Sequence, residues 1–225
     1  MGAFVGWMRR WFPILYGLGF ALVLIVLVVK MHTLTNELWL VALRPLEQNA
    51  LGINVPKVFW HALAMVVAMA ILGKLIEKVD AKFRPVRLIA SNLNFRPLLH
   101  PWMRYPFAAL LLYNLPILAM LEEFIFRHGG LGPHPVQSWQ DVLASSLFFG
   151  LFHGVMSWNL RGGILQTAMG FWFSYLYLSS GGSDPLIYAS FHHFMLDLLV
   201  FTPGVIQLCF FSRHLARGEN PNPAL

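Results

Sequence analysis

The chain has 225 residues, of which 57% are hydrophobic and 12% are charged, against about 25% charged residues in a typical soluble domain. With a mean hydropathy of +0.61, this composition excludes an ordinary soluble domain and favours an integral membrane protein. The net charge of +6 does not indicate nucleic-acid binding, because the basic residues lie in short segments between apolar runs, as in the cytoplasmic loops of membrane proteins. The single cysteine, Cys209, excludes an internal disulfide and a cysteine metal cluster.

Six apolar runs approach the roughly 20 residues that a helix needs to cross a bilayer. They predict spans over residues 13–31, 59–75, 106–127, 139–155, 164–178 and 185–201. We therefore expect an all-α fold, a polytopic membrane helix bundle of about six transmembrane spans, with in-plane helices allowed between them. The first run is too long for a signal peptide.

The connecting segments predict the orientation of these spans. Segment 32–57 is a loop of mixed charge, and segment 74–104 is the most basic loop of the chain. The turns 128–138 and 179–184 are rich in Gly, Pro or Ser and lack Lys and Arg. Because cytoplasmic loops carry the excess of Lys and Arg, we expect the basic loop and both termini on the cytoplasmic side.

A polar interruption stands at the end of the third apolar run, in the sequence Glu122-Glu123-Phe-Ile-Phe-Arg127. An ionisable residue within a membrane span costs roughly 2.5–3.5 kcal/mol and indicates a functional site by default. Glu123 and Arg127 are four residues apart and share a helix face, so they are expected to pair. Glu122 points about 100° away, lacks this partner, and is the candidate general base.

Two later spans carry histidines at helical spacing. Phe149 and His153 are four residues apart, and Gly150 and Gly154 form a small-xxx-small pattern that allows another helix to approach closely. His193 and Asp197 are also four residues apart, and a carboxylate in that position can fix the tautomer of the histidine. His192 is turned away from that face, but it could replace His193 if the sixth helix were rotated. His61 is interpreted as an interfacial histidine. No serine–histidine or cysteine–histidine arrangement stands out, so water activated by Glu122 is the predicted nucleophile.

These motifs, Glu-Glu-x-x-x-Arg at 122–127, Phe-x-x-x-His at 149–153 and Ala-Ser-Phe-His-His-x-x-x-Asp at 189–197, resemble the three motifs of the CPBP family. That family comprises the type II CAAX prenyl endopeptidases and the bacterial Abi-type bacteriocin-processing and immunity proteins. The resemblance covers about residues 105–200. It divides the chain into a two-span region with the basic loop (1–104), a four-span catalytic core (105–201) and a C-terminal tail (202–225).

The resemblance implies an intramembrane endopeptidase of the glutamic type. Glu122 and His153 would activate the water, while His193 and residue 197 would stabilise the oxyanion of the tetrahedral intermediate. The positioning or substrate-contacting residues would be Glu123, Arg127 and Phe149. The family usually has Asn where this chain has Asp197, and an ionised carboxylate cannot donate a hydrogen bond to an oxyanion. Asp197 must therefore be protonated, or only orient His193, or the site is altered.

The same residues leave cofactor and function alternatives open. Glu122, His153 and His193 could also form a two-histidine, one-carboxylate zinc site, the ground on which the family was long classed as metalloproteases. We expect no cofactor and a metal-free site. One alternative function is a non-catalytic immunity or partner-binding protein of the same family, and another is a proton-relay transporter.

The expected partners are the lipid bilayer and a membrane-anchored protein or peptide substrate, in a bacterial or archaeal inner membrane. A bundle of straight antiparallel spans would place Glu122 towards the outer end of its helix and His153 towards the inner end, separated by more than a turn or two. The resemblance requires these side chains to meet. We therefore expect either shifted boundaries or an in-plane segment over 92–110.

Overall fold

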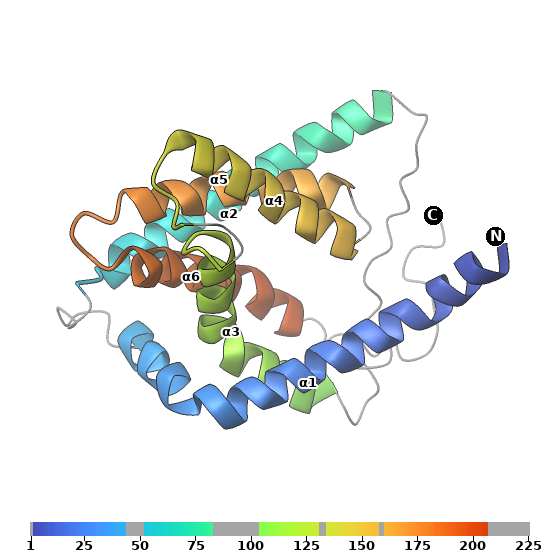
Figure 1. Ribbon diagram of the computed structural model, residues 1–225, viewed down its shortest axis with the longest axis horizontal. Helices are drawn as coiled ribbons and strands as arrows, with labels where there is room; N and C mark the ends of the chain where they lie inside the picture. Colours follow the sequence, from blue (N-terminus) through green and yellow to red (C-terminus); the bar gives the residue numbers. More distant parts are fainter. Residues whose placement is uncertain (1, 44–51, 83–103, 131–133, 158–159, 207–225) are drawn as a thin grey trace.

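The computed structural model describes residues 2–43, 52–82, 104–130, 134–157 and 160–206. These residues form six α-helices and no strand (Figure 1). The helices are α1 (Gly2–Leu43), α2 (Val55–Lys82), α3 (Arg104–Phe126), α4 (Trp139–Ser157), α5 (Leu160–Leu178) and α6 (Pro185–Ile206). The predicted all-α fold is confirmed.

Within the described residues, four helices are long and apolar enough to cross a membrane. The candidate spans are Leu18–Leu43, Val55–Lys78, Tyr105–Phe126 and Pro185–Pro203. Helices α4 and α5, which the sequence predicted as spans, have 19 residues each and are not among the four. Both carry polar residues on the faces that they turn towards each other and towards α3, such as Ser145 and Thr167. The protein is a polytopic helical membrane protein.

Helices α1 and α2 are longer than predicted. Helix α1 runs on to Leu43, so the loop expected from residue 32 begins later. Helix α2 runs from Val55 to Lys82, so the start of the expected basic loop is helical. The remainder of that loop, 83–103, lies outside the described residues, as do the segments 44–51 and 207–225 of the expected first loop and tail.

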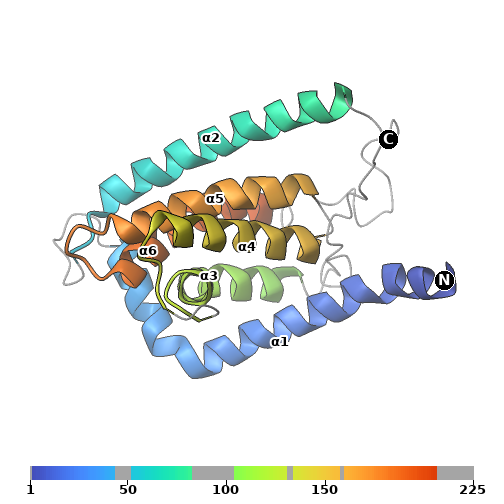
Figure 2. The same ribbon diagram turned by 45° about the horizontal axis from the view of Figure 1, so that its top comes forward.

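Polar contacts between α1 and α3 explain why α1 continues past its apolar run. The Tyr113 hydroxyl donates to Asn36 Oδ1 at 2.8 Å, and Trp39 Nε1 donates to the Tyr113 carbonyl at 2.9 Å. The Trp39 ring also meets Phe194 of α6 edge to face, with centroids 5.0 Å apart. The last part of α1 therefore turns towards the bundle (Figures 1 and 2).

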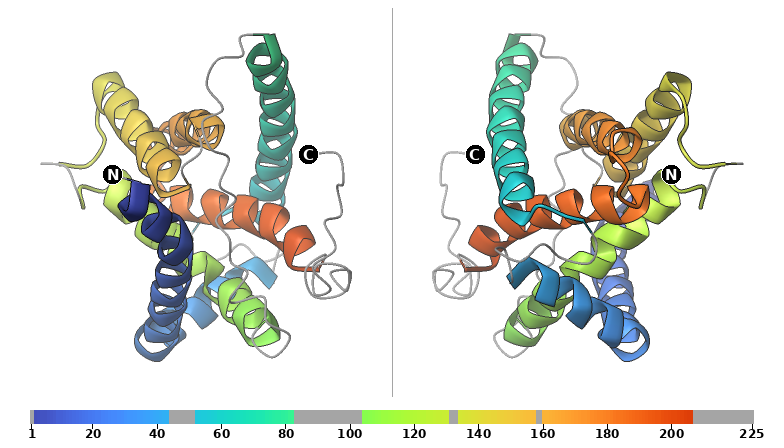
Figure 3. Two further views of the ribbon diagram at one scale, coloured as in Figure 1. Left: turned by 90° about the vertical axis from the view of Figure 1, so that its right-hand side faces the viewer. Right: turned by 90° about the vertical axis from the view of Figure 1, so that its left-hand side faces the viewer.

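Helix α6 runs through the middle of the molecule, with α2 on one side and α1 and α3 on the other (Figure 3). It packs against α2, α3 and α5. The buried side chains that these four helices share include Val58, Leu115, Phe173 and Phe194. A helix contacted from several directions can bring its polar side chains close to those of more than one partner, and this is how α6 contributes to the site.

Helices α4 and α5 form the closest pair, because small residues line both faces. A Cβ on Gly150 would collide with Thr167 and lie 2.6 Å from the Gly163 carbonyl oxygen. A Cβ on Gly170 would lie 2.9 Å from the Ser146 Cα. The small-xxx-small pattern at Gly150 and Gly154 therefore serves the predicted close approach of a helix, and that helix is α5.

Helix α3 bends along its length. In Figure 2 its N-terminal part lies across the view, whereas its C-terminal part is seen nearly end-on. Pro116 lies inside α3, and an internal proline removes a backbone hydrogen bond and kinks a helix. The bend sends the end of α3 across α4 rather than alongside it.

Candidate active site

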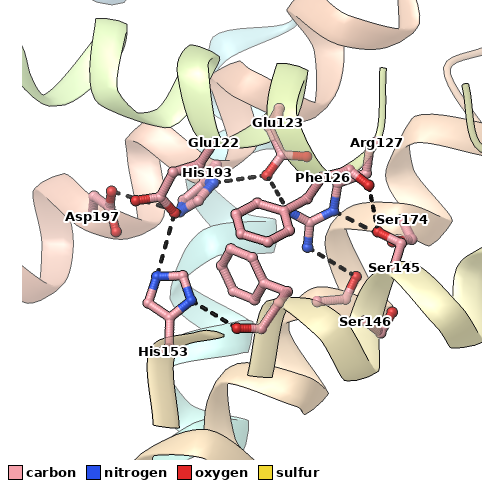
Figure 4. Close-up of polar contacts among 12 residues, drawn as sticks. Glu122, Glu123, Phe126, Arg127, Ser145, Ser146, His153, Ser174, His193 and Asp197 are labelled. Atoms are coloured by element: carbon pink, nitrogen blue, oxygen red, sulfur yellow. Dashed lines mark hydrogen bonds and ion pairs between the residues drawn. The ribbon is translucent and has the colours of Figure 1, made fainter. Parts of the chain in front are cut away.

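A buried ion pair lies at the C-terminal end of α3. Arg127 Nη1 donates to Glu123 Oε1 at 3.2 Å, and both side chains are 0% exposed (Figure 4). The two residues are neighbours on one helix face, so the pairing predicted from their spacing is confirmed. Pairing lowers the cost of burying two charges, but breaking such a pair leaves an uncompensated charge.

Helix α5 supplies further partners for Arg127. Nε donates to Ser174 Oγ and Nη2 donates to the Gly170 carbonyl, each at 3.4 Å. The guanidinium also lies over the Phe149 ring of α4, with Cζ 4.3 Å from the ring centroid, a cation–π arrangement. Sequence reasoning missed Ser174 and Gly170. Their sequence signal is weak, because α5 contains other polar residues and glycines, such as Gln166 and Gly163, that do not contact Arg127 in the structure.

His193 of α6 is bound by the same carboxylate. Its Nδ1 lies 2.7 Å from Glu123 Oε1, and the ring is 3% exposed. Because a carboxylate accepts hydrogen bonds, Nδ1 is the donor. From its spacing, Asp197 is a carboxylate that can fix the tautomer of His193, but at Nδ1 this place is taken by Glu123, from a different helix. Asp197 Oδ2 lies 3.7 Å from the other ring nitrogen, Nε2.

Glu122 faces two histidine rings. Its Oε2 lies 3.7 Å from His153 Nε2 and 3.7 Å from His193 Nε2. These separations exceed a direct hydrogen bond, and a water molecule commonly completes polar contacts of this length. The Glu122 side chain is 35% exposed and that of His153 is 25% exposed, so a reactant can reach the atoms of Glu122 but not those of the buried Glu123.

The orientation of His153 comes from its own helix. Its Nδ1 lies 2.8 Å from the Phe149 carbonyl oxygen one turn earlier. The carbonyl can only accept, so Nδ1 carries the proton and Nε2 is the nitrogen that faces Glu122. The Phe149 ring lies 4.2 Å from the His153 ring, centroid to centroid. The Phe149 ring thus contacts both His153 and the guanidinium of Arg127, whose Cζ lies 4.3 Å from the ring centroid.

The expected difference in depth between Glu122 and His153 does not arise, because α3 and α4 cross. Ser145 Oγ in the first half of α4 donates to the Phe126 carbonyl at the end of α3, at 2.7 Å. The end of α3 thus meets the middle of α4. The boundaries of α3 shift by only two residues at its start and one at its end. The described part of the proposed in-plane segment, from Arg104 on, belongs to this helix.

The side chains described so far form one polar cluster: Glu122, Glu123, Arg127, His153, His193 and Asp197. A further pair of histidines lies outside it. His192 Nδ1 donates to the Tyr188 carbonyl at 2.9 Å, and its Nε2 lies 3.3 Å from His61 Nδ1 of α2. His192 is thus turned away from the face of His193, as predicted. His61, interpreted from the sequence as interfacial, joins α2 to α6.

The donor types of Glu122, His153 and His193 suit zinc. However, no group of three or more His, Cys, Asp and Glu side chains in the described part of the chain is arranged to hold a metal ion. Both histidines direct Nδ1 to a protein acceptor and Nε2 to Glu122, which is also how a metal-ligating histidine is oriented. The metal-free site therefore stays a prediction.

Residues 104–199 match the family model described as type II CAAX prenyl endopeptidase Rce1-like. This segment is similar to the Rce1-like family. The Rce1-like segment contains α3, α4, α5 and most of α6, the four helices that supply every residue of the cluster. The resemblance inferred from the three motifs is thus confirmed. No curated protein and no solved structure matches the chain.

Proposed function

We propose that this protein is an intramembrane endopeptidase that hydrolyses a peptide bond near the C-terminus of a membrane-anchored protein or peptide. The observation that carries the proposal is the position of Glu122 Oε2, at 3.7 Å from Nε2 of both His153 and His193. The Rce1-like segment, whose family generally consists of proteases, supports the same reaction class. In this arrangement one accessible carboxylate and two imidazoles can act on one water molecule and one carbonyl group.

Glu122 and His153 activate the water in this proposal. His153 keeps its proton on Nδ1, so Nε2 accepts a hydrogen bond from the water. Glu122 accepts the proton as the water oxygen attacks the carbonyl carbon of the scissile bond, and the carbonyl π electrons move to its oxygen. General-base catalysis of this kind contributes typically 10²–10⁴-fold to the rate.

His193 stabilises the oxyanion that this attack creates. Glu123 accepts the Nδ1 proton of His193, so a second proton on Nε2 makes the ring a cationic donor directed at the oxyanion. A preorganised donor of this kind is worth about 10²–10³ in kcat. Asp197 adds a second donor when it is protonated, because only the protonated carboxyl group has a hydrogen to donate.

The tetrahedral intermediate then collapses. The C–N bond breaks, and the amine nitrogen takes the proton that Glu122 received from the water. The products are a carboxylic acid and an amine, and Glu122 returns to its ionised form. Glu123 and Arg127 take no part in proton transfer here, but they hold His193 and the end of α3 in place.

The clustering of the polar groups favours hydrolysis over proton conduction. Glu122, His153, His193 and Asp197 meet at one point where three helices approach each other (Figure 4). A proton relay needs polar groups spread through the depth of the bundle. Catalytic groups that are clustered in this way suit the hydrolysis of a single bond.

The test uses purified full-length protein in liposomes with two probes, a farnesylated CAAX peptide and a single-span peptide with a free C-terminal tail. We expect the wild type to cleave at least one probe and Glu122→Gln to cleave neither. Asp141→Asn, which alters a carboxylate at the start of α4 away from the cluster, serves as the matched control and retains activity. Undiminished cleavage by Glu122→Gln would overturn the mechanism, and no cleavage by the wild type would favour the non-catalytic alternative.

A further inference from the structure

Helix α5 carries none of the three sequence motifs, yet it supplies an aromatic ring that stacks on the imidazole of His193. The Phe173 ring stacks on the His193 ring with centroids 4.2 Å apart and an interplanar angle of 20°. Phe173 is 0% exposed. This is the nearest parallel ring to His193 among the described aromatic contacts, since the Phe149 ring meets it edge-on at 6.1 Å and 74°.

The stacked ring matters because the hydrogen bond to Glu123 does not by itself determine the orientation of the His193 ring plane. A single bond from Nδ1 to Glu123 Oε1 locates one atom but leaves the ring able to turn about that bond. A ring stacked in parallel restricts the turn and fixes the plane of the imidazole. The direction of Nε2, which faces Glu122 and Asp197, depends on that plane.

Phe173 is itself held rigidly. The neighbouring Ser174 accepts a hydrogen bond from Arg127 Nε, and the Gly170 carbonyl accepts one from Nη2. Gly170 also packs directly against the backbone of Ser146 on α4. The Phe173 side chain lies in the buried cluster shared by α2, α3, α5 and α6. The turn of α5 around Phe173 is therefore tied to the ion pair and to α4.

We propose that Phe173 is a positioning residue, whose flat face fixes the ring plane of His193 so that Nε2 points to the place where Glu122 and Asp197 meet. The catalytic consequence rests on the proposed peptidase function. Phe173 acts only through His193 and does not touch the reacting atoms. Small errors in the placement of a catalytic group lower the rate steeply, roughly 100-fold for a displacement of 1 Å.

The test compares Phe173→Leu with Phe171→Leu. Leucine keeps an apolar side chain at both positions but removes the flat ring, and Phe171 is 37% exposed on the same helix. We expect Phe173→Leu to lower kcat by roughly 10- to 100-fold with KM within about twofold, and Phe171→Leu to change neither. An unchanged kcat, or a loss explained by KM alone, would contradict the proposal.

A second measurement does not need activity. In histidine-labelled protein, the ring current of Phe173 shifts the His193 ring protons upfield, and His193→Gln identifies these NMR signals. We expect Phe173→Leu to abolish the upfield shift and Phe171→Leu to preserve it. An unchanged His193 signal in Phe173→Leu overturns the stacking. If the wild type cleaves no probe but the shift behaves as expected, then the positioning contact stands and only the peptidase function fails.

Discussion

His193 Nδ1 lies 2.7 Å from Glu123 Oε1, although 70 positions separate the two residues in the chain. The same oxygen accepts a hydrogen bond from Arg127. One carboxylate oxygen therefore joins the ion pair at the end of α3 to the histidine of α6. The two adjacent glutamates therefore differ in role: Glu123 is fully buried and binds Arg127 and His193, whereas Glu122 is 35% exposed and faces Nε2 of both His153 and His193.

The first prediction separates the two glutamates by stability. Glu123→Gln removes the negative partner of a buried guanidinium, and breaking such a pair costs about 3–5 kcal/mol. Glu122→Gln alters a partly exposed carboxylate, and a change outside such a pair costs about 0.5 kcal/mol or less. Denaturation followed in detergent measures both. We expect Glu123→Gln to unfold far more easily than Glu122→Gln.

A double variant tests whether the loss of stability in Glu123→Gln comes from the unpaired charge of Arg127. Combining Glu123→Gln with Arg127→Met removes both charges, so no uncompensated charge stays buried. We expect the double variant to be more stable than Glu123→Gln alone but to cleave more slowly than the wild type, because an amide oxygen is a weaker acceptor for His193 Nδ1 than the carboxylate. Equal stability of the two single glutamate variants would show that the pair does not anchor the fold.

The second prediction concerns the close packing of α4 and α5. In Gly150→Ala the new Cβ collides with Thr167 and lies 2.6 Å from the Gly163 carbonyl oxygen, which is backbone and cannot move aside cheaply. We expect the helices to be forced apart, with a loss of about 1–3 kcal/mol and of cleavage, because His153 is oriented from the turn that contains Gly150. Thermal unfolding and peptide cleavage measure the two effects.

Gly19→Ala is the matched control for this helix substitution. A Cβ at Gly19 meets nothing within 4 Å, and replacing a helical glycine by alanine is favourable by about 0.5–1 kcal/mol. We expect the control to be as stable as the wild type or slightly more stable, with full activity. A Gly150→Ala variant that behaves like Gly19→Ala would contradict the close packing.

The third prediction addresses Asp197, which stands where the family usually has asparagine. An asparagine amide donates a hydrogen bond at every pH, whereas a carboxyl group donates only while it is protonated. If Asp197 donates to the oxyanion, wild-type activity falls as the pH rises and Asp197 ionises. We expect Asp197→Asn to keep at least wild-type activity at neutral pH and to extend it to more alkaline pH. The readout is kcat against pH for both proteins.

Asp197→Ala supplies the comparison in that experiment. Alanine can neither donate nor accept, so we expect lower kcat across the whole pH range and no recovery on the alkaline side. Identical pH profiles for the wild type and Asp197→Asn would show that the protonation of Asp197 does not control the reaction.

Local chemistry made several features predictable from the sequence. The apolar runs locate all six helices of the described residues, because burial in lipid or in the bundle requires such runs. The pair Glu123–Arg127 follows from helix geometry alone, since residues four apart share a face. The ends of α1 and α2 were not predictable in the same way. Polar residues such as Asn36 indicate a loop when the sequence is considered alone. In the structure Asn36 is helical, and its side chain accepts a hydrogen bond from Tyr113 of α3.

The residues in order were thus enough to predict a helical membrane protein, the family resemblance of the segment 104–199, and the charged pair within α3. The contacts between side chains of different helices could not be predicted in this way. Glu123 rather than Asp197 binds His193 Nδ1, and the bend of α3 across α4 brings Glu122 to His153. Phe173 and Ser174 of α5 enter the site without any motif. The physical reason is that spacing along the chain governs contacts within one helix, whereas contacts between helices depend on crossing, bending and close packing.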